Sequence, residues 1–151
     1  MIRRKSRELI VQTVYALNYA EVDAYLLNLD YLNKYREILE NIASENEIKI
    51  DSSIFTYADN CLKQLVPKLE EIDEVITLNI GDYKFEKIGL LDLIIMRLAI
   101  FEMLFLEERT PPPVMINEAV ELAKKFCAEK SPSLINAILD NVRKMKVEDG
   151  E

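Results

Sequence analysis

The chain of 151 residues has the length of one domain, and its 50% hydrophobic and 30% charged residues exclude a disordered chain. Charges interrupt its longest apolar stretch and the N-terminus lacks a secretory leader, so we expect a cytoplasmic protein without a membrane span. The net charge of −8 disfavours nonspecific nucleic-acid binding. The absence of histidine, with only two cysteines and three glycines, argues against an enzyme with catalytic residues, a metal site or a cofactor.

Apolar residues recur at helical spacing in successive segments of the chain. The predicted helices are 3–20, 23–43, 51–80, 85–106, one from about Val114 and one from Ser131. Pro67 is expected to kink the third of them, while Ser131 and Pro132 supply an N-cap and a first-turn proline for the last. Because no alternating strand pattern occurs, the predicted fold is all-α, a compact bundle of about six to seven helices. It forms a single domain over 1–151, with an N-terminal half of about 1–80 and a C-terminal half of about 81–145.

The first predicted helix carries a local basic cluster inside an acidic protein. The cluster consists of Arg3, Arg4, Lys5 and Arg7, opposed within the first twelve residues by Glu8 alone. Helical projection separates an apolar side, with Leu9, Ile10, Val14 and Leu17, from a side with Arg4, Gln12, Tyr15 and Tyr19. Aromatic rings stack on bases, amides read base edges and cations bind phosphates, so this pattern predicts a single-stranded RNA site. An equally weighted alternative is that the tyrosines pack on a neighbouring helix and the cations are merely solvated.

Three charged residues interrupt the apolar segment 85–106, namely Asp92, Arg97 and Glu102. We expect a buried ionic cluster, which pairs these charges for structural reasons and also marks a face for another protein. Cys61 and Cys127 are too few for a disulfide framework and are expected to be buried small hydrophobes.

Several stretches are similar to the NusB family. The stretch 114–126, VMINEAVELAKKF, closely resembles the most recognisable helix of that family, which follows a proline-containing loop. The segment 92–102 and the sequence NAILD at 136–140 resemble two further family segments. At the N-terminus, RRKSRE at 3–8, with Gln12 and Tyr15, is similar to the family's opening.

The resemblance implies an all-helical protein of two short helical bundles packed together. Family members are not enzymes: they bind the boxA element of RNA with the ribosomal protein NusE, and act in the transcription elongation complex to sustain ribosomal-RNA transcription. The implied RNA contacts are Arg3, Arg4, Arg7, Gln12 and Tyr15, joined at the last helix by Ser133, Leu134 and Asn136. The face around Asp92 is implied to meet NusE. The sequence departs from the family pattern at Leu93, Lys130, Leu134 and Ala137.

Other functions fit the same residues. One alternative is a protein-interaction or homodimerising module in which the RNA face is masked by a second copy. Another is a ribosome-assembly factor. A third is an RNA-modifying enzyme, because the same helical domain is found fused ahead of a ribosomal-RNA methyltransferase, although this chain has no glycine-rich cofactor loop.

Overall fold

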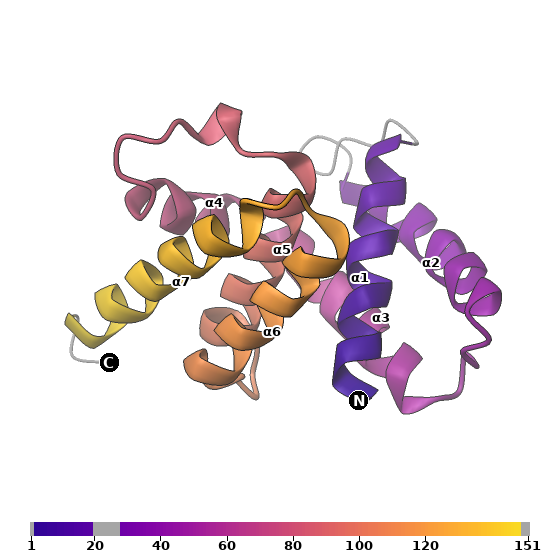
Figure 1. Cartoon of the computed structure of the whole chain (residues 1–151). Coiled ribbons are helices and arrows are strands. Elements are labelled where there is room, and N and C mark those ends of the chain that lie inside the picture. The colour runs from indigo at the N-terminus through magenta and orange to yellow at the C-terminus, as the bar shows by residue number, and fades with distance from the viewer. Residues whose placement is uncertain (1, 20–27, 149–151) are drawn as a thin grey trace. The chain divides into compact units, whose positions relative to one another are not determined.

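The computed structural model describes residues 2–19 and 28–148, and every regular element assigned in these ranges is helical (Figure 1). This confirms the predicted all-α fold. Within these ranges, no helix is both long and apolar enough to cross a membrane. Backbone contacts divide the chain into two compact units, Met1–Pro67 and Lys68–Glu151. The division thus falls at Pro67 rather than near residue 80, because the helix after Pro67 packs with the elements that follow it.

The first unit contains α1 (Ile2–Tyr19), α2 (Asn28–Glu45) and α3 (Ser53–Leu65), and α1 packs against both of the others. Ser52 caps α3, since its hydroxyl oxygen accepts a hydrogen bond from the Phe55 amide at 3.2 Å. The first residues of the helix predicted at 23–43 lie outside the described residues. The unit's fully buried apolar side chains include Leu9, Ile10, Leu39, Phe55 and Leu62.

The second unit begins at the end of a short 3-10 turn, η1 (Val66–Lys68), so the helix is interrupted at Pro67 as predicted. Its helices are α4 (Leu69–Leu78), α5 (Leu90–Ile100), α6 (Pro112–Phe126) and α7 (Ser131–Glu148). α5 contacts α4, α6 and α7, and α6 and α7 pack along one another. The buried side chains of α5 are Ile94, Ile95, Met96, Leu98, Ala99 and Ile100. With partners in α4, α6 and α7, α5 is the central helix of the second unit.

The segment predicted as one helix over 85–106 is divided into three. A 3-10 turn, η2 (Phe85–Lys87), comes first, and Gly89 then stands as the N-cap of α5 with an extended backbone. After α5, the chain continues as a π-helical segment, η3 (Phe101–Phe105), in which the Leu106 amide donates to the Phe101 carbonyl at 2.9 Å. Because nearly the whole segment is apolar, its sequence pattern did not indicate either of the two points at which the helix is interrupted.

Candidate nucleic-acid interface

The basic N-terminal end of α1 is positioned by α3 within the first unit. The Ser6 hydroxyl donates a hydrogen bond to the Ile54 carbonyl at 2.9 Å. Near it, the Arg3 guanidinium lies over the Tyr57 ring, 3.6 Å from the ring centroid, which is a close cation–π contact. Arg3 remains exposed while it is stacked in this way. Its charge is therefore held in a defined place at the surface rather than on a freely moving side chain.

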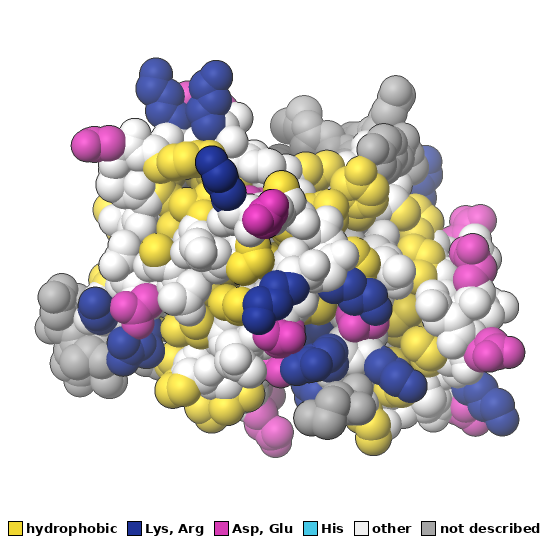
Figure 2. All heavy atoms as spheres, in the orientation of Figure 1, with side chains coloured by type: hydrophobic (Ala, Val, Ile, Leu, Met, Phe, Trp, Pro, Cys, Tyr) yellow, Lys and Arg dark blue, Asp and Glu magenta, His cyan; other side chains and the backbone are white. Residues whose placement is uncertain are grey.

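The four predicted cations of α1 differ in exposure. Arg3 and Lys5 are exposed, Arg4 is half-buried, and Arg7 is only 4% exposed. Both Arg4 and Arg7 engage in further polar or ring contacts. This differs from the expectation that the whole cluster lies open at the surface. The reason is helical geometry: Arg7 precedes Ile10 by three positions, so it continues the buried stripe of the helix. Figure 2 shows dark-blue Lys and Arg side chains at the N-terminal end of α1.

The remaining α1 residues of the predicted site are less open than the cations. Gln12 and Tyr15 are both half-buried, and Tyr15 makes polar or ring contacts of its own. Spacings of eight and eleven residues from Arg4 keep these two side chains near its face of the helix. Tyr19 is the last residue of α1, but its side chain lies outside the described residues.

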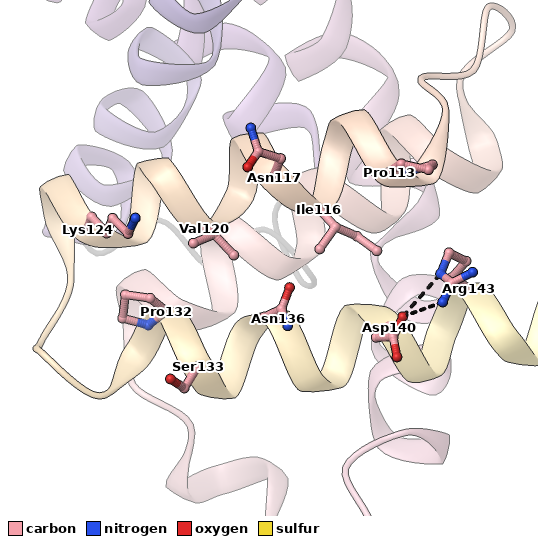
Figure 3. A pocket seen from close by; sticks show the side chains of 10 residues that line it. All are labelled: Pro113, Ile116, Asn117, Val120, Lys124, Pro132, Ser133, Asn136, Asp140 and Arg143. Atoms are coloured by element: carbon pink, nitrogen blue, oxygen red, sulfur yellow. Dashed lines mark hydrogen bonds and ion pairs between the residues drawn. The ribbon is translucent and has the colours of Figure 1, made fainter.

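Ser133 and Asn136 belong to the second unit, where both are exposed on α7. They line a groove between α6 and α7 with a volume of about 600 Å³ (Figure 3). Opposite them, α6 contributes apolar side chains, among them Ile116 and Val120. The predicted residues of α7 thus face a concave surface, which sequence reasoning did not anticipate.

The three charges expected to form one ionic cluster are each held by a different element. Arg97 pairs with Asp73 of α4 through two bonds of 2.8 Å, a bidentate geometry. Glu102 is fully buried and accepts a hydrogen bond from the Thr110 hydroxyl at 2.9 Å. The Thr110 amide also donates a hydrogen bond to the Glu102 carbonyl. Glu102 therefore holds the loop that precedes the three prolines through both its side chain and its backbone. Arg97 and Glu102 thus have hydrogen-bonding partners within the second unit, which gives both residues a structural role.

Asp92 is the third of these charges, and it lies beside the loop that joins α6 to α7. Its carboxylate accepts a hydrogen bond from the Ser131 hydroxyl at 2.8 Å. Ser131, predicted as an N-cap, is instead the first residue of α7 with its hydroxyl directed to α5. Cys127 is half-buried rather than buried. Burial, followed by its hydrogen bond to Asp92, raises the pKa of the Cys127 thiol to about 12.

The fold and these residues define a small all-α protein whose candidate sites are polar binding surfaces. A model of the NusB family matches residues 4–144. The chain therefore belongs to the NusB family of non-enzymatic transcription antitermination proteins.

Three similar proteins illustrate this membership. The transcription antitermination protein NusB of Clostridium botulinum (strain Kyoto / Type A2) is 38% identical over 141 residues, which cover 92% of this chain and 97% of that protein. The structure of T. maritima NusB is 26% identical with a TM-score of 0.76, covering 94% of this chain and 90% of that one. A third match is a crystal structure of antitermination factors NusB and NusE in complex with double-stranded RNA. It is 22% identical with a TM-score of 0.77, and the match covers 95% of this chain and 97% of that one. This last likeness shows the shared fold.

Two features of the candidate surfaces were missed from the sequence. Tyr57 carries no motif of its own, and only the folded contact between α1 and α3 brings its ring to Arg3. Val120 and Arg143 line the groove beside Asn136, yet they read as ordinary positions of amphipathic helices. The sequence did contain one indication of the groove: the loop between α6 and α7 is short, so the two helices must pack side by side.

Proposed function

We propose that this protein binds boxA-type single-stranded RNA together with the ribosomal protein NusE, and so supports ribosomal-RNA transcription. Membership of the NusB family and the cationic end of α1 support this proposal. The observation that supports the proposal most strongly is that the Arg3 guanidinium is exposed and stacked on the Tyr57 ring. Because its place is fixed in advance, less conformational entropy is lost when it pairs with a phosphate.

The charge of the whole chain explains why a second protein would be needed. With a net charge of −8, the long-range field of the chain repels a polyanion. A few exposed cations, such as Arg3 and Lys5, provide a limited number of phosphate contacts. NusE would add basic surface, and its presence should therefore raise the affinity for RNA.

RNA binding is tested by fluorescence anisotropy with a labelled boxA-type single strand. The double variant Arg3→Ala, Lys5→Ala should bind at least tenfold more weakly than the wild type, both with and without NusE. The matched control Lys34→Ala, Lys63→Ala removes the same charge from exposed positions of α2 and α3 and should change affinity less than threefold. Equal losses for the two double variants would contradict the placement of the RNA site on α1.

The contact with NusE is proposed at the start of α5, around Asp92. Leu90, two residues before Asp92 in the first turn of α5, is an apolar side chain that is 39% exposed. Leu90→Asp should weaken NusE binding tenfold or more, and an acidic residue in the first turn of a helix is compatible with folding. Leu78→Asp, at a position of α4 that is 74% exposed, serves as the control. The placement is wrong if calorimetry finds both variants bound to NusE like the wild type.

A further inference from the structure

We propose that a groove along α4 is a docking site for a cationic helical segment of a protein other than NusE. This α4 groove has a volume of about 460 Å³ and lies entirely within the second unit. It is lined by Glu70, Asp73, Glu74, Thr77 and Leu78 of α4 and by Phe85 of η2. The inference goes beyond RNA binding and the NusE contact at the start of α5, and it depends on neither.

Helix α4 presents two different faces. Its buried side chains are all apolar, namely Leu69, Ile72 and Ile76. The groove residues Glu70, Glu74 and Leu78 follow one another at four-residue spacing, so they share a second face. The sequence of α4 contains no lysine or arginine. The groove therefore presents two carboxylates and one apolar side chain, each about one helical turn from the next.

Leu78 and Phe85 form the apolar part of the α4 groove. Leu78 is 74% exposed, which is the highest exposed fraction among the large apolar side chains that the structure describes. Phe85 is half-buried and contributes an aromatic ring from η2. An apolar side chain of a partner placed against these two residues would remove apolar surface from water on both proteins, which favours association.

The connection from α4 to Phe85 is anchored within the second unit (Figure 1). The side-chain amide of Asn141, on α7, donates a hydrogen bond to the Asn79 carbonyl at 3.3 Å. Gly81 then turns the chain with a positive φ of 59°, a conformation that favours glycine. The two sides of the groove are thus in place before a partner binds, which lowers the entropic cost of association.

The carboxylates of Glu70 and Glu74 determine the charge of the partner. Both are exposed, and neither has an ion-pair or hydrogen-bond partner in the described part of the chain. Asp73, in contrast, already pairs with a cation of α5. Lys84 and Lys87 are exposed on the neighbouring segment but do not line the groove. Lysine or arginine side chains of a partner would complement the two free carboxylates, whereas a nucleic acid or an anionic membrane would be repelled.

The spacing of the groove residues defines the partner further. A helix that lies along α4 would meet the groove with two lysines or arginines one turn apart and an apolar side chain one turn further. A small cation would leave Leu78 exposed, so a protein segment fits the groove better. Leu90 and Asp92, where the NusE contact is proposed, do not line this groove. The α4 groove is therefore available to a second protein.

The test uses a capped, alanine-rich peptide with two lysines one helical turn apart and a leucine one turn further. Its binding to the intact protein is followed at low salt by two-dimensional NMR, and the backbone amides of the groove residues should shift. Glu74→Gln and Leu78→Gln should each weaken binding about three- to fivefold. The matched controls Glu71→Gln and Val114→Gln change exposed positions outside the groove and should bind the peptide as the wild type does.

Three results would overturn the docking site: no shift of the groove amides, equal binding of a peptide with glutamate in place of lysine, or wild-type affinity of Leu78→Gln. The last result would show charge attraction without a seated apolar side chain. NusE should bind Glu74→Gln and Leu78→Gln as it binds the wild type, and a loss of NusE affinity would assign the groove to NusE and overturn the proposal. Failure of the wild type to bind boxA-type RNA would end the proposed function and leave the docking site intact. Circular dichroism verifies that each variant is folded.

Discussion

The Ser131 hydroxyl donates a hydrogen bond to the Asp92 carboxylate at 2.8 Å, which ties the first residue of α7 to the first turn of α5. Besides burial, the same carboxylate contributes to the raised pKa of the Cys127 thiol, which follows the last residue of α6. One side chain of α5 thus holds the loop that connects α6 to α7. Since that loop sets where α7 begins, Asp92 also helps to fix the place of Ser133 and Asn136.

Removing the hydroxyl of Ser131 should destabilise the protein. Ser131 is buried, and a hydrogen bond to a carboxylate contributes more than one between neutral groups, so Ser131→Ala should lower the free energy of unfolding by about 1 to 2 kcal/mol. Urea denaturation measures this loss. Ser133→Ala, at an exposed position of the same helix, should stay within about 0.5 kcal/mol of the wild type. Equal effects of the two variants would show that the bond to Asp92 contributes nothing to stability.

Cys127 should resist alkylation although it is half-buried rather than buried. Its pKa of about 12 keeps the thiol protonated at pH 9, and the thiolate is the reactive form. Asp92→Asn removes a nearby negative charge, which lowers the pKa of Cys127 and should speed its reaction with iodoacetamide several-fold at pH 9. Mass spectrometry assigns the modified residue, and the fully buried Cys61 is an internal control. An unchanged rate at Cys127 would show that burial alone suppresses its reactivity.

The bidentate pair of Arg97 and Asp73 should contribute to the stability of the second unit. Both side chains are largely buried, at 14% and 19% exposure. Arg97→Ala leaves the carboxylate without this partner and should lower the free energy of unfolding by about 2 to 4 kcal/mol. Arg97→Lys keeps the charge but loses the fork geometry, so it should fall between the wild type and the alanine variant. A lysine variant as unstable as the alanine variant in thermal unfolding would show that charge at this position has no effect.

The stacking of Arg3 on Tyr57 should matter for RNA affinity. Tyr57→Leu removes the ring that holds the guanidinium in place and should weaken RNA binding about three- to fivefold, which corresponds to a cation–π contact at an exposed site. Tyr57→Phe retains the ring and should bind nearly as the wild type does. If the leucine variant binds RNA as tightly as the wild type in the anisotropy titration, prior positioning of Arg3 has no role.

The sequence predicts the helices well because each one has its own apolar period, and helix ends are marked where Ser52 or Pro67 supplies a local signal. It fails where apolar content is continuous, as over 85–106, because composition does not locate the break at Gly89. The basic cluster of α1 could be found from the sequence, and so could the burial of Arg7, since it precedes Ile10 by three positions. The partners of Asp92, Arg97 and Glu102 could not be found, because each comes from an element distant in the chain.

The salt dependence of RNA affinity tests most directly whether α1 binds RNA through its exposed cations. Each phosphate contact to single-stranded RNA contributes about −0.7 to the slope of log affinity against log salt concentration. In titrations from low to moderate salt with NusE present, Arg3→Ala, Lys5→Ala should have a slope less negative than that of the wild type by about 1 to 1.4. A slope identical to that of the wild type and to that of Lys34→Ala, Lys63→Ala would contradict the assignment of the RNA site to α1.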